Sequence, residues 1–428
     1  EELFLRAYQT ASTLRTLCAE RSLPWPPEET SYYSPAELGK PRLLVGREPI
    51  NGWDLGLLPD ELHRHLLVLG MSGSGKTNVL LTLAAEISRL NAGPRRDAAL
   101  IFDRHGNFSG LARYGYRVLE PEEVLLPLLF LYTPGFVRKV LLLTGELRHL
   151  RKSRNTVFEA YERVRNVLPS GEAPTLTHVV RALQNLYYKD SKNDYRLSAL
   201  TELKDLLSSM ASTWDWTSSK MPARLFAPGQ LTVIRTQNLD VGEERLLLGW
   251  LGIYGIETGN AFGRNHNVYL ILDEAQPLYE KDWRGGNVLR TLKANILTAR
   301  QPRVCLIAGA QLPAQLEPEL LASCNSILCC GLQDADGIKA VASAMGVAHG
   351  DAYPLFQGLE QNEAVFANAD RPGPIKLEVP RTTVPSRCDE KRRRARVRQF
   401  QKACHARPGR PWKPLQSKIK ARAGTARG

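Results

Sequence analysis

Residues 65–90, HLLVLGMSGSGKTNVLLTLAAEISRL, decide the fold of this 428-residue chain. The apolar run Leu66–Leu69 predicts a strand that is covered on both faces. After residue 75, apolar side chains recur at helical spacing until Asn91–Pro94 ends the helix. Between strand and helix lies Gly70-x-x-x-x-Gly75-Lys76-Thr77, a complete phosphate-binding loop pattern in the context that this pattern requires.

This loop predicts a binding site for ATP and Mg²⁺. The glycines let backbone N–H groups approach a polyphosphate, and the helix N-terminus adds partial positive charge. Lys76 is expected to reach the β- and γ-phosphates, and the Thr77 hydroxyl is expected to bind Mg²⁺. The predicted nucleotide-binding residues of this stretch are Gly70, Ser72, Gly73, Ser74, Gly75, Lys76, Thr77 and Asn78.

Length and composition indicate a large globular protein. The chain is 43% apolar, which suffices for one large domain with appended pieces. No run of 18 apolar residues occurs, so no membrane insertion is expected, and no secretory signal is visible. The seven cysteines lack zinc-ligand spacing, which favours reduced thiols in a cytoplasmic protein.

Apolar runs alternating with helical patterns predict an α/β fold with a mostly parallel sheet flanked by helices. Strands are expected at 42–51, 66–69, 98–102, 231–235, 267–272, 304–308, 326–330 and 364–367. Three helical patterns, at 155–168, 176–188 and 195–210, predict a helical insertion. The expected division is an N-terminal helix and connector (1–40), a core (41–140 and 221–380), the insertion (141–220) and a basic tail (387–428).

The strand predicted at 98–102 ends in polar residues that are candidates for nucleotide binding. We expect this strand beside the phosphate-loop strand, where Asp103 and His105 would face the nucleotide at the carboxyl edge of the sheet. A solvated turn that uses Asp, Gly and Asn is the alternative interpretation.

A second acidic site follows the apolar run 267–272. Asp273 is expected to hold Mg²⁺ through a water, and Glu274 is expected to orient and deprotonate the attacking water. An acidic pair in this position favours hydrolysis over phosphoryl transfer to another substrate, so the sequence predicts an ATPase.

Two further residues are candidates for catalysis. Gln311 follows the strand predicted at 304–308 and would contact the γ-phosphate or the attacking water if that strand neighbours the one before Asp273. Its alternative is a plain turn residue. Arg300 closes a predicted helix at 289–300, where it is either a solvated cap or an arginine finger for a neighbouring subunit.

Several ordered stretches resemble the HerA–FtsK superfamily of ring ATPases, and they resemble its HerA side more closely. They are GMSGSGKT at 70–77, FDRHGNF at 102–108, LTVIRTQNLD at 231–240, YLILDEAQPL at 269–278 and LTARQPRVCLIAGAQLP at 297–313. The resemblance covers roughly residues 42–380. It implies a RecA-like core and a homo-oligomer, a hexameric ring that moves DNA through a central pore.

The resemblance also assigns residues. It places the family's sensor glutamine on Gln311 and its arginine finger on Arg300, with Arg303 as the nearby competitor. It places the family's Asp-x-His-Gly segment on Asp103 and His105. Residues 1–40 depart from the pattern, because they are too short for the β-barrel that usually begins HerA proteins.

All of the chain's excess positive charge lies in the predicted tail. Residues 387–428 hold 15 Lys and Arg against two acids, which accounts for the whole net charge of +13. The run Lys391, Arg392, Arg393, Arg394, Arg396 and Arg398 is expected to be disordered and to bind DNA phosphates without sequence specificity. A solvated charge run or an address signal is the alternative.

These features together predict an ATP-hydrolysing ring motor that translocates along double-stranded DNA, with unwinding as an associated activity and a nuclease or defence protein as partner. Two alternatives stay open. One is a coupling or secretion ATPase that delivers DNA or protein to a membrane machine, and the other is a regulatory nucleotide switch.

Overall fold

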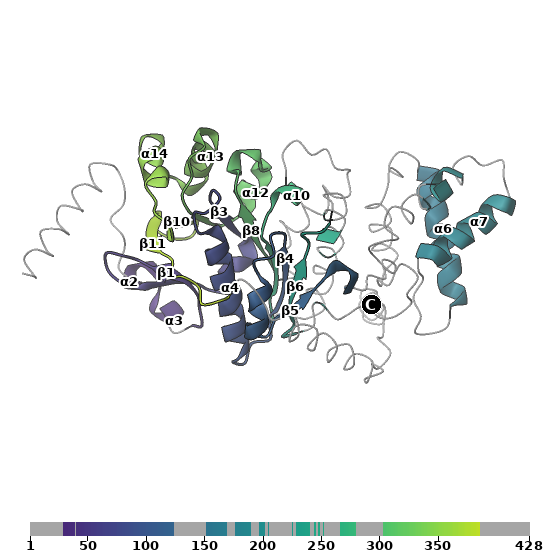
Figure 1. The fold of residues 1–428 in the computed structure, drawn as a ribbon, viewed down its shortest axis with the longest axis horizontal. Helices are drawn as coiled ribbons and strands as arrows, with labels where there is room; N and C mark the ends of the chain where they lie inside the picture. Colours follow the sequence, from purple (N-terminus) through teal and green to yellow (C-terminus); the bar gives the residue numbers. More distant parts are fainter. Residues whose placement is uncertain are drawn as a thin grey trace, which may run out of the picture.

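The computed structural model describes residues 29–38, 40–123, 151–168, 176–189, 197–201, 204, 225, 228–239, 244, 247–248, 251, 266–279 and 303–385. Within these residues an 11-stranded sheet has the order β2-β1-β11-β10-β9-β3-β8-β7-β4-β6-β5 (Figure 1). From β9 to β5 neighbouring strands run parallel, and β10, β11, β1 and β2 extend the sheet with antiparallel pairs. The predicted mostly parallel, RecA-like α/β fold is confirmed.

The strands are β1 (Leu43–Arg47), β2 (Asp54–Leu57), β3 (Leu66–Leu69), β4 (Ala98–Asp103), β5 (Arg117–Leu119), β6 (Leu231–Arg235), β7 (Val268–Leu272), β8 (Val304–Ala310), β9 (Ser326–Cys329), β10 (Glu363–Asn368) and β11 (Ile375–Glu378). The α-helices are α2 (Glu29–Tyr32), α3 (Pro35–Leu38), α4 (Lys76–Asn91), α6 (Arg151–Val167), α7 (Leu176–Lys189), α10 (Gln276–Tyr279), α12 (Pro318–Ser323), α13 (Ala335–Met345) and α14 (His349–Gln357). Short 3₁₀ turns are η1 (Glu61–Arg64), η2 (Ser109–Tyr114), η3 (Pro121–Glu123) and η4 (Pro313–Gln315).

The central strands are buried on both faces because helices cover both sides of the sheet. In β3, Leu66 and Val68 point into one apolar cluster, which includes the buried face of α4. Leu67 and Leu69 point into the other cluster, which includes residues of α13 and α14. This alternation explains why β3 reads as an unbroken apolar run.

The structure corrects one predicted neighbour. The strand at 98–102 was expected beside the phosphate-loop strand, but β4 pairs with β7 and β6, and β3 pairs with β8 and β9. Two strands, β8 and β7, therefore separate β3 from β4. The crossovers that set this order are long-range, so a local sequence pattern does not specify them.

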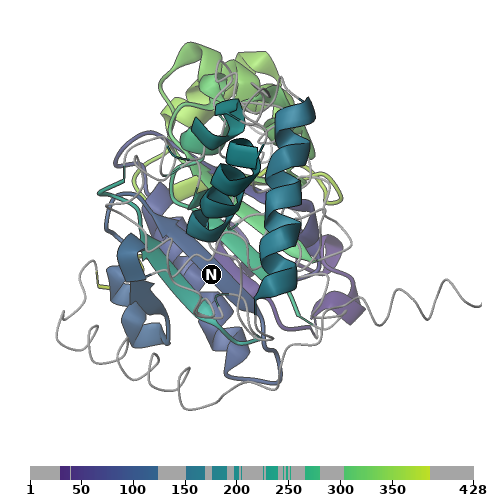
Figure 2. The same ribbon diagram turned by 90° about the vertical axis from the view of Figure 1, so that its right-hand side faces the viewer.

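The helices predicted for the insertion at 155–168 and 176–188 correspond to α6 and α7, which pack on each other. Figure 1 shows them beyond β5 and β6, at the opposite end of the sheet from α2 and α3. In Figure 2, the view onto that end, they stand in front of the strands. The predicted helix over 289–300 lies outside the described residues, as do residues 1–28 and the tail at 387–428.

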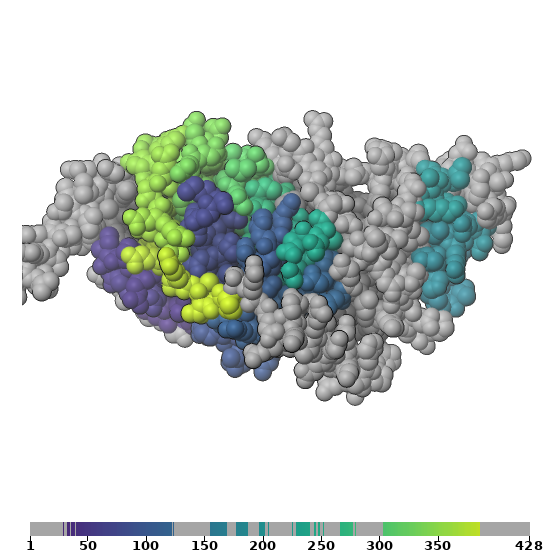
Figure 3. Space-filling model, viewed as in Figure 1, coloured from purple at the N-terminus to yellow at the C-terminus, as the bar shows by residue number. Residues whose placement is uncertain are grey.

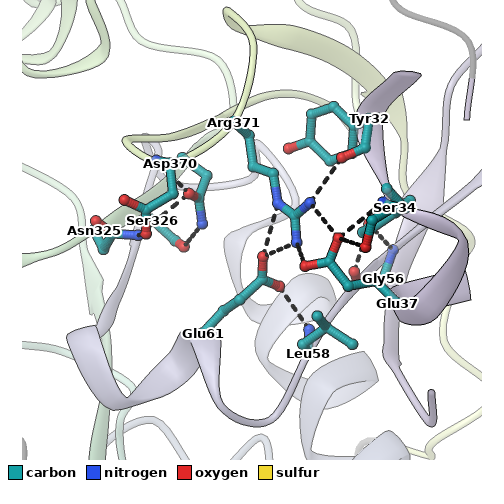
Figure 4. A network of polar contacts seen from close by, with 12 residues as sticks. Tyr32, Ser34, Glu37, Gly56, Leu58, Glu61, Asn325, Ser326, Asp370 and Arg371 are labelled. Atoms are coloured by element: carbon teal, nitrogen blue, oxygen red, sulfur yellow. Dashed lines mark hydrogen bonds and ion pairs between the residues drawn. The ribbon is translucent and has the colours of Figure 1, made fainter. Parts of the chain in front are cut away.

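A polar cluster around Arg371 fastens the N-terminal helices to the antiparallel half of the sheet (Figure 4). Arg371 lies in the turn between β10 and β11, and its guanidinium donates to Glu37 of α3 at 2.9 Å and to Glu61 of η1 at 2.5 Å. It also donates to the Tyr32 carbonyl at 2.7 Å and lies 5.0 Å from the Tyr33 ring centroid. The hydrogen bond from Arg371 lowers the pKa of Glu37 to about 2.

We expect Arg371→Ala to lower the free energy of unfolding by about 2–4 kcal/mol, since it leaves two partly buried carboxylates without their buried cation. Arg64→Ala is the matched control, because Arg64 pairs with Asp370 at the surface, and it should cost less than about 1 kcal/mol. Urea unfolding at neutral pH measures both variants. Equal losses would contradict the assigned role of Arg371.

Candidate nucleotide site

The phosphate-binding loop joins β3 to α4 at the carboxyl edge of the parallel strands. Gly73 and Gly75 adopt φ of 81° and 107°, a region that glycine enters without strain. The loop is anchored at its start, where the Gly70 N–H donates to the Ala310 carbonyl and the Met71 N–H donates to the Gly331 carbonyl. The 16-residue helix α4 then begins at Lys76, so its N-terminus points at the loop's concave side.

The acidic pair predicted after β7 lies directly beside the loop's lysine. The buried Lys76 ammonium donates to the Asp273 backbone carbonyl at 3.3 Å, and it lies 3.7 Å from the Glu274 carboxylate. These residues are about 200 positions apart in the sequence. The sheet brings them together because β3 and β7 both flank β8 in parallel register.

The Asp273 side chain is fully buried, and its carboxylate meets little polar compensation among the described residues. The His105 backbone N–H faces it, but neither carboxylate oxygen has a hydrogen bond of normal geometry. Burial raises the pKa of Asp273 to about 7; Lys76 opposes this shift, and the Asp103 and Glu274 carboxylates add to it. Two unsatisfied oxygens beside an anion-binding loop fit a hydrated Mg²⁺, which in such sites is held by few carboxylates and by substrate phosphates.

Gln311 lies where its predicted role requires. It follows β8, the neighbour of β7, as the prediction assumed. Its amide Nε2 donates to the Glu274 carboxylate at 3.0 Å, on the same oxygen that faces Lys76. In this arrangement Gln311 orients the carboxylate of Glu274, and its contact with a γ-phosphate or attacking water stays a prediction.

Gly309 in β8 allows β8 to pack closely against the end of β7, and its role was not predicted from the sequence. A Cβ at Gly309 would lie 2.5 Å from the Asp273 carbonyl oxygen and 3.0 Å from Leu80 of α4. The Gly309 carbonyl also accepts the Ala275 N–H at 2.7 Å. The signal was a lone glycine inside an otherwise apolar strand, which marks a close backbone approach.

Asp103 and His105 have different places in the structure. The Asp103 carboxylate is buried and accepts backbone N–H groups from Asn107 and Phe108 at 2.9 and 3.0 Å, so it closes its own turn. Burial raises the pKa of Asp103, and these hydrogen bonds oppose the shift. His105 instead is exposed and lines the cavity in front of the loop. The turn alternative therefore describes Asp103, whereas His105 borders the cavity and its contact with nucleotide stays a prediction.

The cavity in front of the loop has a volume of about 560 Å³, within the range of small-molecule sites. It is lined by Met71, Ser72, Gly73, Gly75, Lys76, Thr77, Asn78, His105, Asn107, Gln311, Gln361, Asn362, Arg381 and Thr382. Gly70 and Ser74 support the loop from behind, and the Ser74 hydroxyl donates to the Met71 carbonyl at 2.9 Å. No carboxylate is among the lining residues of the described chain, so the cavity suits an anion.

Some predicted site residues are not placed. Arg300 and the tail residues Lys391, Arg392, Arg393, Arg394, Arg396 and Arg398 lie outside the described residues. Arg303 is described, at the amino end of β8 and 3.6 Å from the Asp60 carboxylate. It therefore lies at the opposite end of that strand from Gln311 and the cavity of its own chain.

Comparisons with known proteins agree with this architecture. A protein-family model described as "Helicase HerA, central domain" matches residues 43–251. The match covers just under half of the chain and includes the phosphate-binding loop. The acidic pair and Gln311 lie C-terminal to the matched residues, so their assignment rests on the geometry described above.

Solved structures share the fold at low sequence identity. VirB4 of Thermoanaerobacter pseudethanolicus superposes with a TM-score of 0.59 at 14% identity, covering 80% of this chain and 97% of VirB4. The plasmid coupling protein TrwB, solved in complex with ADP and Mg²⁺, gives a TM-score of 0.58 at 16% identity, with 78% and 89% covered. No curated protein sequence gives a significant match. Among the described residues, no helix has the length and apolar character needed to cross a membrane.

We expect Gly309→Ala to reduce ATP turnover at least 10-fold, because the added methyl displaces the peptide that follows Asp273, and small displacements of catalytic groups are costly. Gly350→Ala is the matched control, since a Cβ there meets no atom within 4 Å. Steady-state hydrolysis by folded protein measures both. Wild-type turnover in Gly309→Ala would show that the close approach is dispensable.

Asp273→Asn should stabilise the nucleotide-free protein in a pH-dependent way. The folded protein keeps the Asp273 proton up to about pH 7, whereas the unfolded chain loses it near a pKa of about 3.9. The free energy of unfolding of the wild type therefore falls relative to that of the variant as pH rises from about 4 to about 7. Above pH 7 the two free energies differ by about 1–3 kcal/mol. Denaturant unfolding from pH 4 to 8 tests this, and a constant difference would refute it.

Proposed function

We propose that this HerA-type chain is the subunit of a ring motor that hydrolyses ATP and translocates along double-stranded DNA. The observation that carries the proposal is the contact of Lys76 with Asp273 and Glu274, with Gln311 hydrogen-bonded to Glu274. A phosphate-binding lysine, a buried metal-type acid, a candidate base and a polar amide at one sheet edge are the parts of an ATP-hydrolysing site.

The residues have distinct roles in this proposal. Lys76 and the α4 N-terminus bind the β- and γ-phosphates, which requires Lys76 to exchange its contact with Glu274 for the nucleotide. Thr77 and Asp273 would hold Mg²⁺, which neutralises phosphate charge when bound. Glu274 accepts the proton of the attacking water, and Gln311 positions the Glu274 carboxylate. The presence of ADP and Mg²⁺ in the TrwB structure supports this choice of ligands.

A hexameric ring with a trans arginine belongs to the same proposal. Arg300 is the candidate arginine finger by its place in the motif order, and it would stabilise the transition-state charge on a neighbouring subunit's nucleotide. Arg303 is the weaker candidate, because its guanidinium already lies beside Asp60 in its own chain.

Duplex DNA is the proposed track. The family model's description as a helicase domain supports a nucleic-acid substrate, and the 15 basic residues at 387–428 supply a phosphate-binding segment. A nuclease or defence protein is the proposed partner of such a motor.

A coupling or secretion ATPase is the second candidate, and the fold shared with TrwB and VirB4 favours it. The two candidates differ in where activity appears. A coupling ATPase would co-purify with an envelope complex, whereas the proposed motor works on DNA in solution.

We expect duplex DNA to stimulate ATP hydrolysis several-fold in protein whose oligomeric mass has been measured.

Glu274→Gln should bind ATP but hydrolyse it at least about 100-fold more slowly, because the proton acceptor is lost. Truncation after residue 386 should weaken DNA binding and flatten its salt dependence while basal hydrolysis persists. Slow turnover that no DNA changes would replace the motor with a regulatory nucleotide switch.

A further inference from the structure

The last described residues, 379–385, form what we call the strap, which crosses the N-terminal half of α4. The strap follows β11, and its Val379 N–H donates to the Asn362 carbonyl at 2.7 Å. Val379 and Val384 are buried in the apolar cluster that includes α4. In Figure 3 the yellow end of the described chain lies across the purple-to-blue atoms of the N-terminal half, and Figure 1 shows the same path in front of α4.

Asn78 pins the strap to the first turn of α4. Its amide Nδ2 donates to the Pro380 carbonyl at 2.9 Å, and its Oδ1 accepts the Thr382 N–H at 2.7 Å. Asn78 was predicted to bind nucleotide, and it lines the cavity; its amide also has two backbone partners in the strap. The Asn78 side chain thus holds both peptide groups that flank Arg381. Asn78 itself lies two residues after Lys76.

The far end of the strap is fastened on the other side of α4. The Thr383 hydroxyl lies 2.8 Å from the Tyr114 hydroxyl of η2. The Pro385 carbonyl packs directly on Gly110, where any side chain would collide with it. The strap is therefore held at both ends, and α4 lies between the strap and the sheet (Figure 1).

Arg381 is the one residue of the strap that puts a charge into the nucleotide cavity. Its side chain is exposed and lines the cavity together with Lys76 and Thr77. It forms no ion pair or hydrogen bond with another described residue, and no described carboxylate lines the cavity. A guanidinium that borders an anion site and has no partner among the described residues is suited to bind phosphate oxygens.

We propose that Arg381 binds the polyphosphate of the nucleotide within its own chain, and that the nucleotide thereby locks the strap across α4. The inference rests on the proposed nucleotide binding and adds a second phosphate-binding cation, which the loop motif does not contain. The pinned peptides on both sides of Arg381 reduce the conformational entropy lost when it binds. Linkage then requires the reverse effect, in which a fastened strap raises nucleotide affinity.

The first test is equilibrium binding of a fluorescent, non-hydrolysable ATP analogue. Arg381→Ala should weaken binding about 10- to 100-fold, as expected for lost hydrogen bonds to a charged group, and Arg381→Lys should restore part of it. Arg113→Ala is the matched control, because Arg113 is an exposed arginine of η2 that does not line the cavity. Wild-type affinity in Arg381→Ala would overturn the inference.

Competition with inorganic tripolyphosphate separates phosphate binding from recognition of base or ribose. If Arg381 binds phosphate, Arg381→Ala weakens tripolyphosphate and the ATP analogue alike. A loss confined to the ATP analogue would overturn the phosphate assignment. Failure of the wild type to bind either compound would instead refute the proposed nucleotide site, so the two failures are distinguishable.

Hydrogen exchange tests the locking of the strap. The ATP analogue should slow exchange of the Thr382 amide in the wild type, and this protection should be lost in Asn78→Ala and in Arg381→Ala. The affinity losses of these two substitutions should be less than additive, because each disables the same strap. Exchange at Thr382 that ignores the nucleotide, or fully additive losses, would overturn the linkage.

Discussion

A carboxyl group buried beside the phosphate-binding lysine constrains the rest of this site. Asp273 lies at the end of a strand that is covered on both faces, and its carboxylate lacks hydrogen bonds of normal geometry among the described residues. Keeping an ionised acid there is costly unless a cation is close. Lys76 is close enough to oppose the pKa rise, and the unsatisfied oxygens leave room for a second cation. The site is thus arranged for a Mg²⁺ ion that binds together with the nucleotide.

The acidic and the basic side chains around the loop lie at different depths below the surface. The acids Asp273 and Glu274 lie behind Lys76 at the strand ends, whereas the cavity in front is lined by cations and neutral polar groups. An incoming polyphosphate therefore meets Lys76 and Arg381 before any carboxylate of the described residues. The same layering explains why Lys76 needs a resting partner: without nucleotide, its ammonium is buried and Glu274 supplies the nearest charge.

The parts of the site that could be predicted from the sequence are those written in consecutive residues. The loop at 70–77 and the acidic pair at 273–274 each combine an apolar run with a polar end, so both strand and chemistry were readable. The adjacency of β7 and β8, on which the role of Gln311 depends, was posed as a condition and is met.

What the sequence did not reveal depends on long-range geometry. The place of β4 in the sheet is set by crossovers, and β5, with three residues, and β11, with four, are too short to give a periodic signal. Gly309 matters only because the Asp273 carbonyl packs on it. Arg381 reaches the cavity because Asn78, three hundred residues earlier, holds the peptides around it.

The order of strands also has a consequence for synthesis of the chain. β3, which carries the phosphate-binding loop, pairs with β8 and β9, whose residues follow it by more than 230 positions. β1 pairs with β11 across a still longer separation. A nascent chain therefore holds β3 without either neighbour until most of the protein has left the ribosome. Such non-local pairing slows folding and leaves apolar strand edges open to aggregation in the meantime. Expression of this protein should thus depend on chaperones that shield β3 until its late partners arrive.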